Sequence, residues 1–402
     1  MKTVCVLLDM SIWNDARVER SVKSMSQYSK VDLFCLRLKK DDTEKFSRFN
    51  ENVRVFPIQK QESKKITLIR HSYFHKEYSY FINEVLKTGI TYDLIFANDL
   101  TTTYPAFVLA KKMNAKFIYD THELFVETLN QLFPTKARGI KKIIYSAMVS
   151  FLRSVGRKWE KKVLQTTDLL VTTNETYLKY LREHYQFGDS VIMPNYPLLA
   201  SYSYSEKLYE VLNIPKSKKI ILYQGVLNEG RYLYEIIDSA RFLNNENILV
   251  IIGSGQLAPL LHQHVEKYNL QEKVKFIPRV DYKDLLSYTP SASLGLMLIE
   301  HINLSKKYSL ANKVTEYMAC GVPVLASEST ENIRIISQAK SGVTKSFNTG
   351  EEIGNYLNEL MKNSEQLKQW GRNGREAFEK EFNWEKHEPI FFAAFKKVLE
   401  AK

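Results

Sequence analysis

The run Leu310-Ala-Asn-Lys-Val-Thr-Glu-Tyr-Met-Ala-Cys-Gly-Val-Pro-Val324 follows an apolar strand at residues 293–299 and a polar loop that holds two lysines. A helix that begins near Asn312 would point its unpaired backbone N–H groups at a ligand, with Lys313 adding positive charge. Glu316, one turn further on, would accept hydrogen bonds from sugar hydroxyls. The Gly-Val-Pro that follows ends the helix. The run therefore predicts a site for a phosphate-sized anion.

The size and composition of the chain fit a globular protein of two domains. Of its 402 residues 44% are apolar, enough to form substantial cores. No stretch approaches the roughly 18 uncharged apolar residues of a membrane span, and the first eight residues resemble a strand rather than a signal peptide. We therefore expect a soluble, cytoplasmic protein. The three cysteines are scattered and show no CxxC spacing, which argues against disulfides and structural zinc.

The formal net charge of +12 predicts an anionic partner: nucleic acid, a membrane surface or a phosphate-bearing substrate. No helix-turn-helix, zinc finger or RNP-type strand is recognisable, so we do not expect nucleic-acid binding. There is no DxD to hold a metal on a nucleotide diphosphate, and Asp281 and Asp284 have a different spacing. We expect a site without metal or cofactor that binds phosphate through helix ends and basic side chains.

Short β-rich runs alternate with helical patterns along both halves of the chain, as in parallel α/β sheets. The strands are expected at 4–8, 31–36, 53–58, 94–97, 117–119 and 169–172, then at 220–224, 248–252, 274–277, 293–299 and 322–326. The stretch 193–205, with two prolines and no helical period, is the candidate linker. The tail 365–402 is expected to be helical, with a break near Asn383. Ligands of such sheets bind beyond the carboxyl ends of the strands, so we expect the active site in a cleft between the halves.

Three short motifs follow strands. Gly253-Ser-Gly-Gln-Leu-Ala258 matches a dinucleotide-binding pattern, but Glu272 precedes its strand instead of ending it, so a tight strand-to-helix turn is the better interpretation. His122, in Tyr119-Asp-Thr-His-Glu123, either contacts a sugar or caps the next helix. Arg231 either binds a diphosphate or is a solvated surface residue.

A long amphipathic helix is predicted over residues 139–165. Its apolar side chains recur with helical spacing: Ile140, Ile143, Ile144, Ala147, Met148, Phe151, Leu152, Val155, Trp159 and Val163. Its basic residues leave two interpretations open, a core helix with a solvated face or a helix on anionic lipid: Lys141, Lys142, Arg153, Arg157, Lys158, Lys161 and Lys162. A second basic group would extend the same surface if the fold brings it there: Lys64, Lys65, Arg70, His71 and Lys76, interleaved with Ile69, Tyr73 and Phe74.

Along almost its whole length the chain resembles the GT-B glycosyltransferases of retaining family 4. The matching stretches are 97–99, 119–125, 223–231, 249–255 and 311–324. The resemblance implies two Rossmann-like parallel-sheet domains facing across a cleft, and a C-terminal helix that crosses back to the N-terminal domain. It implies an acceptor domain at 1–197, a nucleotide-sugar donor domain at 198–382, and the returning helix at 383–402.

The resemblance also implies roles for individual residues. His122 is similar to the family's catalytic-cleft histidine, Glu316 to the glutamate that binds the nucleotide ribose, and Arg231 to a diphosphate-binding lysine. Asn312 and Lys313 belong to the same donor site, and Arg279 and Val280 stand where the base is usually held. Acceptor or cleft positions are expected for Asp99, Glu123 and Glu300.

Two positions depart from the family pattern, since Tyr308 replaces the first glutamate of E-x7-E and Val226 replaces a frequent arginine. The implied activity is metal-independent, retaining transfer of a sugar from a nucleotide diphosphate to a hydroxyl of a glycan or lipid-linked acceptor in surface polysaccharide synthesis. We expect the protein in the cytoplasm; separately, the basic helix at 139–165 predicts peripheral contact with the inner face of the membrane if it lies on anionic lipid. The alternatives are a GT-B sugar-nucleotide epimerase, with Glu123 or Glu300 as acid/base groups, and a non-catalytic glycan-binding or partner protein.

Overall fold

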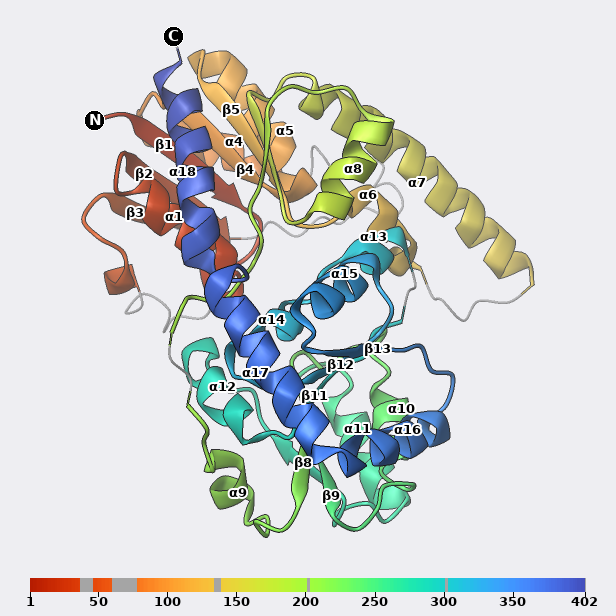
Figure 1. The fold of residues 1–402 in the computed structure, drawn as a ribbon. Helices are drawn as coiled ribbons and strands as arrows, with labels where there is room; N and C mark the ends of the chain where they lie inside the picture. The colour runs from red at the N-terminus through yellow and green to blue at the C-terminus, as the bar shows by residue number, and fades with distance from the viewer. Residues whose placement is uncertain (37–45, 60–77, 134–138, 201–202, 301–302, 402) are drawn as a thin grey trace. The chain divides into compact units, whose positions relative to one another are not determined.

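The computed structural model describes residues 1–36, 46–59, 78–133, 139–200, 203–300 and 303–401 (Figure 1). The chain forms two compact units. Unit 1 consists of Met1–Asn195, Asn303–Ser305 and His387–Lys402, and unit 2 of Tyr196–Ile302 and Lys306–Lys386. The second basic group expected at 64–76 lies outside the described residues.

Unit 1 is built on a parallel sheet of seven strands in the order β3-β2-β1-β4-β5-β6-β7. The central strands are almost wholly buried, as expected for a parallel sheet covered on both faces. The strands are β1 (Thr3–Leu8), β2 (Lys30–Leu36), β3 (Val53–Ile58), β4 (Leu94–Asn98), β5 (Lys116–Thr121), β6 (Leu169–Thr172) and β7 (Ser190–Ile192).

The helices of unit 1 connect these strands, and polar residues fix several of their ends. Asp15 caps the first helix, and the Asn174 side chain accepts from the Tyr177 N–H at 2.8 Å. The helices are α1 (Ala16–Met25), α4 (Tyr80–Leu86), α5 (Asp99–Met113), α6 (Phe125–Thr128), α7 (Ile140–Leu164) and α8 (Glu175–His184), with 3-10 turns at Ile12–Asn14 and Leu129–Leu132.

Unit 2 contains a parallel sheet of six strands in the order β10-β9-β8-β11-β12-β13. Ile220 and Leu222 of β8 pack in one hydrophobic cluster, and Ile221 and Tyr223 pack in another. Because successive side chains of a strand point to opposite faces, the sheet has a core on each side. The strands are β8 (Lys219–Gln224), β9 (Asn247–Ile252), β10 (Val274–Ile277), β11 (Leu294–Met297), β12 (Val324–Ala326) and β13 (Gly342–Thr344).

The helices of unit 2 cover this sheet. They are α9 (Lys207–Leu212), α10 (Leu233–Ser239), α11 (Ala258–Lys267), α12 (Tyr282–Tyr288), α14 (Asn312–Ala319), α15 (Thr330–Ala339), α16 (Gly350–Lys362) and α17 (Ser364–Lys380), with a 3-10 turn at Thr289–Ser291. α14 ends before Gly321, whose φ of +65° lies in the left-handed region where glycine is favoured.

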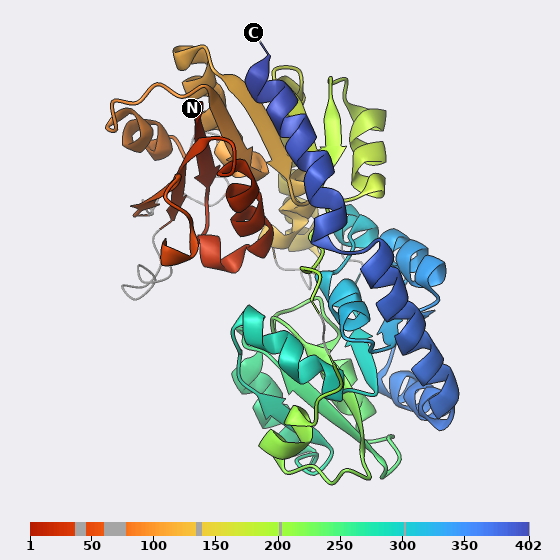
Figure 2. The ribbon, with the colours of Figure 1, turned by 60° about the vertical axis from the view of Figure 1, so that its left-hand side comes forward.

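The last helix, α18 (Trp384–Glu400), returns to unit 1, as predicted (Figures 1 and 2). The break before it is made by Asn383, whose amide nitrogen donates to Phe378 O at 2.7 Å while its oxygen accepts from Lys386 N at 3.2 Å. Within unit 1 the Phe391 ring meets Phe96 edge-on, with centroids 6.3 Å apart. The Ser24 hydroxyl also donates to the Glu388 carboxylate.

Three short elements differ from the sequence expectation. The stretch around Lys306 and Lys307, expected as a loop, contains helix α13 (Leu304–Tyr308). Strands β7 and β13 were not expected at all. Each has three residues, too few for an alternating pattern to be recognised.

The glycines of Gly253-Ser-Gly255 allow two loops to pack backbone to backbone. Leu227 N donates to Ser254 O, and Leu257 N donates to Leu227 O, both at 2.9 Å. A methyl group on Gly255 would lie 2.7 Å from Asn228 Oδ1 and still closer to Leu227 O. This close approach supports the interpretation of the motif as a tight strand-to-helix turn.

Candidate functional site

Both sheets have a topological switch point, where the strand order reverses. In unit 1 it lies between β1 and β4, and in unit 2 between β8 and β11. Ligands of doubly wound α/β units bind outside the carboxyl ends of the strands at this point. The predicted site residues follow strands near both switch points, and each group is described within its own unit.

In unit 2 the loop after β8 brings Gly225 against the Lys313 side chain. Gly225 has a φ of +136°, and a methyl group here would lie 2.6 Å from Lys313 Nζ and closer still to Cε. The Lys313 ammonium also lies 5.9 Å from the centre of the Tyr223 ring. The lysine side chain therefore crosses the end of β8 at a place where only glycine leaves room.

Three cations gather around this position. The pKa of Lys313 is lowered to about 8, first by burial and then by the nearby positive charges of Arg231 and Lys306, while Glu316 opposes the change. Burial raises the pKa of Tyr223, and Arg231, hydrogen-bonded to its side chain, lowers it in part. Arg231 and Lys313, predicted from separate motifs, are thus neighbours. An anion placed here would relieve their mutual repulsion.

Helix α14 begins beside this cluster. Ala311 precedes its first residue, Asn312, and has no side chain with which to cap the helix. Asn312 is exposed and Lys313 is half-buried. The first-turn N–H groups and the positive end of the helix dipole therefore lie next to the Lys313 ammonium, as the sequence predicts.

Glu316 is fixed by hydrogen bonds among buried side chains that were not predicted from the sequence. Gln224 Nε2 donates to Glu316 Oε2 at 2.7 Å, and Gln224 Oε1 accepts from Thr289 Oγ1 at 2.8 Å. Glu316 is 6% exposed and Gln224 is fully buried. Gln224 could have been predicted from the sequence, because it ends β8 directly before Gly225. Nothing in the sequence pointed to Thr289.

The remaining unit 2 candidates lie at different distances from this cluster. Glu300 follows β11, and its N–H donates to Gly230 O at 3.0 Å, which joins it to the loop that carries Arg231. Arg279 and Val280 follow β10, which is two strands away from β8. Arg279 is exposed, whereas Val280 packs partly against the core.

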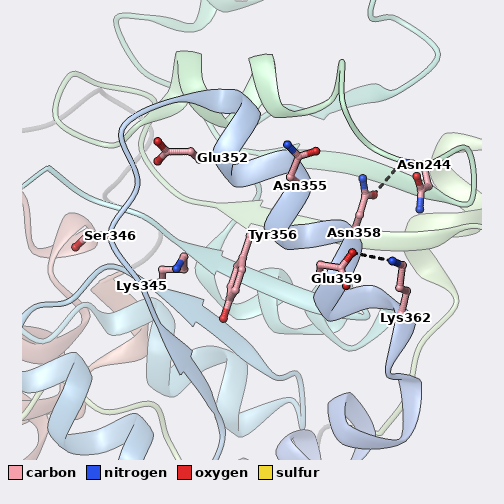
Figure 3. A pocket seen from close by; sticks show the side chains of 9 residues that line it. All are labelled: Asn244, Lys345, Ser346, Glu352, Asn355, Tyr356, Asn358, Glu359 and Lys362. Atoms are coloured by element: carbon pink, nitrogen blue, oxygen red, sulfur yellow. Dashed lines mark hydrogen bonds and ion pairs between the residues drawn. The ribbon is translucent and has the colours of Figure 1, made fainter.

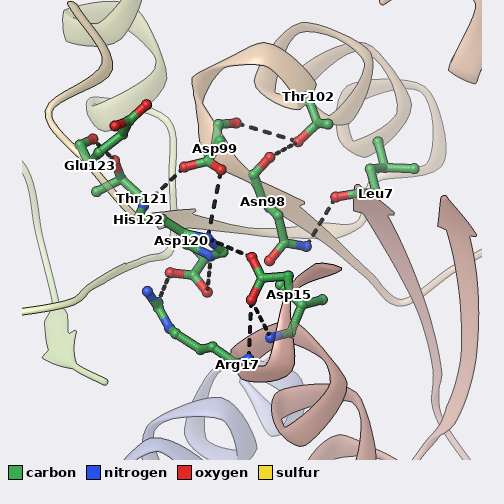
Figure 4. Close-up of polar contacts among 11 residues, drawn as sticks. Leu7, Asp15, Arg17, Asn98, Asp99, Thr102, Asp120, Thr121, His122 and Glu123 are labelled. Carbon is green, nitrogen blue, oxygen red and sulfur yellow. Dashed lines mark hydrogen bonds and ion pairs between the residues drawn. The ribbon is translucent and has the colours of Figure 1, made fainter. Parts of the chain in front are cut away.

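In unit 1 His122 lies among three aspartates (Figure 4). Its Nδ1 is 3.1 Å from Asp15 Oδ2 and 3.6 Å from Asp99 Oδ2, and its Nε2 is 3.3 Å from Asp120 Oδ2. The backbone N–H of His122 donates to Asp99 Oδ1 at 3.0 Å. The other Asp120 oxygen forms a buried ion pair with Arg17. The histidine ring is therefore surrounded by carboxylates, and its role is not that of a helix cap.

The combined effect of burial and nearby charges raises the pKa values of both His122 and Asp99. Burial lowers the pKa of His122, but the three carboxylates outweigh burial and the Arg17 charge and raise it well above its usual value. Burial raises the pKa of Asp99 to about 7, with Asp9 and Glu123 adding to the effect and His122 opposing it. Asp99 has a φ of +60°, which is strained for a non-glycine residue and common at functional sites.

Sequence reasoning missed Asp15, Arg17 and Asp120. Asp120 is two residues from His122, so strand alternation placed it on the same face. Asp15 and Arg17 come from a different strand-to-helix connection, and nothing in their local pattern pointed to His122. The other carboxylate predicted in unit 1 besides Asp99 is Glu123, whose backbone oxygen accepts from Thr121 Oγ1 at 2.8 Å.

Helix α7 is divided into two halves with different surroundings. In its C-terminal half Trp159 donates to Thr103 Oγ1 at 2.9 Å, and Arg157 pairs with the buried Glu127 at 2.7 Å. In its N-terminal half the apolar side chains are exposed: Ile140 76%, Ile143 71%, Ile144 50% and Phe151 53%. The apolar residues expected to share one buried face are therefore buried only in the second half.

A hollow on the surface of unit 2 lies along α16 (Figure 3). It contains the Tyr356 side chain and several amide and charged groups. None of the residues predicted to form the functional site lines it. Its lining residues are Asn244, Lys345, Ser346, Glu352, Asn355, Tyr356, Asn358, Glu359 and Lys362.

Comparison with known proteins finds a family similar to the second half of the chain. Residues 205–377, which include the whole Arg231–Lys313–Glu316 cluster, match the family described as "Glycosyl transferases group 1". The match covers 173 of the 402 residues, so the similarity to group 1 glycosyltransferases is shown for this part of the chain. An uncharacterized glycosyltransferase of Methanocaldococcus jannaschii is 25% identical over 189 residues, which cover 42% of this chain and 51% of the relative. The chain spans about half the length of the curated relatives it matches.

Solved structures share the fold along the whole length of this chain. Sucrose-phosphate synthase from Thermosynechococcus elongatus aligns over 100% of both chains with a TM-score of 0.78 and 17% identity. Anabaena HepE in complex with UDP-glucose aligns over 98% of this chain and 99% of HepE, with a TM-score of 0.74 and 13% identity. The predicted fold class is confirmed: two parallel α/β sheets in a GT-B-like fold, with a C-terminal helix that contacts the N-terminal unit.

Proposed function

We propose that this chain transfers a sugar from a nucleotide diphosphate to a hydroxyl of a glycan or lipid-linked acceptor, in the synthesis of a surface polysaccharide. The observation that carries the proposal is the group of Arg231, Lys306 and Lys313 beside the first turn of α14, at the unit 2 switch point. Side chains and backbone N–H groups that converge in this way suit a diphosphate without a metal ion. In this proposal the transfer retains the configuration of the sugar.

The donor would be bound by residues of unit 2. Lys313, Arg231 and the first-turn N–H groups of α14, including that of Asn312, stabilise the negative charge of the departing diphosphate. Glu316, fixed by Gln224, accepts from the ribose hydroxyls. The backbone around Arg279 and Val280 holds the base. UDP is the first nucleotide to test, because the similar HepE structure contains UDP-glucose.

In unit 1 His122 acts next to the donor sugar, with Asp99 and Glu123 as further polar groups. Because both ring nitrogens face carboxylates, the histidine contributes a positive charge rather than a free lone pair. Such a fixed charge acts most strongly where water is excluded.

Isothermal titration calorimetry with UDP tests the phosphate site. A charge-assisted hydrogen bond is worth about 1.5–3 kcal/mol, so Lys313→Ala and Arg231→Ala should each weaken binding by about 10- to 100-fold. Lys345→Ala, in the hollow along α16, is the matched control and should bind UDP like the wild type. Unchanged affinity in both site variants would contradict this assignment.

A sugar-nucleotide epimerase is the second candidate, because Glu300 lies at the loop that carries Arg231 and its charge contributes to the raised pKa of Tyr232. Incubation with sugar nucleotide alone separates the two functions. An epimerised sugar nucleotide would support the epimerase, whereas transfer of the sugar to an added acceptor would support the transferase. If the chain binds the sugar nucleotide tightly but forms neither product, the result would favour a non-catalytic protein.

We also infer that the N-terminal half of α7 binds the anionic inner face of a membrane. Among the described helices, none is both long and apolar enough to cross a bilayer. Four large apolar side chains are nevertheless exposed on this half, and the exposed Lys141 and Lys142 lie beside them. Arg153 and Arg157 are held by Glu127, so only part of the predicted basic face remains for lipid. This combination suits a helix lying in the headgroup region.

Flotation with liposomes that contain anionic lipid tests this contact. Burial of one isoleucine contributes about 1.5–3 kcal/mol, so the double variant Ile140→Glu/Ile144→Glu should lose most of its binding. Leu260→Glu, a similarly exposed position in unit 2, is the control. Binding should also weaken at high salt, because the lysine contribution is screened. No flotation of the wild type at low salt would contradict the inference.

A further inference from the structure

Asp15 is held rigidly by the backbone at the start of α1. Its Oδ1 accepts from Arg17 N and Val18 N, each at 3.1 Å, as the N-cap of the helix. This leaves Oδ2 directed at His122 Nδ1, 3.1 Å away (Figure 4). Both oxygens are thus engaged, and rotation of the carboxylate would break two capping bonds. The orientation of the His122 ring is set by a group that cannot easily turn.

The opposite nitrogen of the ring faces a second fixed carboxylate. Asp120 Oδ2 lies 3.3 Å from Nε2, and the other Asp120 oxygen is paired with Arg17, whose side chain is 1% exposed. Nε2 makes no hydrogen bond to this carboxylate, so the interaction is electrostatic: a ring with protons on both nitrogens is positively charged and is attracted to Asp15 and Asp120, whereas a neutral ring is not. The geometry therefore favours a ring with protons on both nitrogens.

We propose that Asp15 is a positioning residue for His122, holding the ring in one orientation and, together with Asp120, keeping it as a cationic imidazolium. This proposal rests on the proposed function and specifies the role of His122. The ring acts on the donor sugar as a fixed positive charge and does not accept a proton from the acceptor hydroxyl. Asp15 belongs to none of the motifs by which the family was recognised. Its contribution depends only on the cap geometry and the 3.1 Å contact.

The other charged groups around the ring agree with this assignment. Asp99 lies 3.6 Å from Nδ1, and Asp9 and Glu123 act on Asp99 by their charges. Burial raises the pKa of Asp15, but His122, the Val18 N–H and Arg17 more than offset this and hold it below its usual value. Asp15 thus stays ionised near neutral pH.

The test is an NMR titration of the His122 ring in the full chain, with Asp15→Asn as the variant. Asparagine is as good an N-cap as aspartate, so this change removes the charge while preserving the helix start. Loss of one adjacent opposite charge should lower the pKa of His122 by about 1–2. Asp15→Glu keeps the charge and should restore much of the wild-type value. Asp93→Asn, on a carboxylate paired with Lys2 elsewhere in unit 1, should leave it unchanged.

A wild-type His122 that titrates near its ordinary pKa of 6.5 would overturn the proposal. So would an Asp15→Asn variant that folds and leaves the His122 titration unaltered. This readout needs no transferase activity, so it stands or fails separately from the proposed function. In a kinetic assay of active enzyme, Asp15→Asn should move the loss of activity caused by deprotonation of His122 to lower pH than in the wild type; equal pH profiles would also count against the proposal.

Discussion

Replacing Gly225 by alanine should impair nucleotide binding through Lys313, although alanine itself would contact no ligand. The added methyl group would lie 2.6 Å from Lys313 Nζ and even closer to Cε, well inside van der Waals contact. The lysine must leave its place over the end of β8. If the charge-assisted bond to phosphate is lost, UDP affinity should fall by about 1.5–3 kcal/mol, which is about 10- to 100-fold.

The mechanism can be separated from a general loss of stability. Alanine at a φ of +136° is strained, so Gly225→Ala should also lower the unfolding free energy by about 1–2 kcal/mol. Gly89→Ala is the matched control, because Gly89 also has a positive φ, +68°, but has nothing within 4 Å of an added methyl group. Gly89→Ala should be less stable than the wild type. At temperatures below its melting transition it should bind UDP with wild-type affinity.

A double-mutant cycle measured by calorimetry decides whether the effect passes through Lys313. If it does, Gly225→Ala/Lys313→Ala should bind UDP no more weakly than Lys313→Ala alone. Losses that add in full would refute this reasoning, because the glycine would then act on the ligand by another route. Unchanged UDP affinity in folded Gly225→Ala would refute it as well.

Three further outcomes follow from the same contacts. Lys313, with a pKa of about 8, should take up a proton when UDP binds at pH 8. The buffer supplies this proton, so the calorimetric binding enthalpy of the wild type should vary with the ionisation enthalpy of the buffer. The binding enthalpy of Lys313→Ala should not. Asp99 keeps its proton up to about pH 7 in the folded chain and releases it near pH 3.8 in the unfolded chain. The free energy of unfolding should therefore fall as the pH rises from 3.8 to about 7. Urea titrations should show a smaller fall for Asp99→Asn. Gly255→Ala should destabilise unit 2 by about 1–3 kcal/mol, because its methyl group would meet Leu227 O; an unchanged thermal transition would argue against the close packing of these loops.

The long strands and helix α14 were predictable because local patterns determine them. The buried apolar runs of β1 and β8 are near-continuous, and the α14 helix has a clear end at Gly321. Arg231 became a candidate because it lies between a strand and a helix, and Lys313 because it lies at the start of a helix. Their proximity to Tyr223 was not predictable, because it depends on how two loops pack.

Other features depend on tertiary structure alone. Periodicity predicted that α7 has an apolar side. It could not predict that this side is buried at Trp159 and exposed at Ile143, because burial depends on which other elements pack against the helix. The carboxylates around His122 come from three strand-to-helix connections, brought together by the order β1-β4-β5 in the sheet. Asp15 was therefore invisible to motif analysis.

A crystal structure of the chain with UDP tests the central claim most directly, because it locates the diphosphate. The account predicts phosphate oxygens at the first turn of α14, within hydrogen-bond distance of Lys313 and Arg231, with the ribose beside Glu316. A nucleotide bound elsewhere, for example in the hollow beside Tyr356, with the α14 end unoccupied, would contradict it.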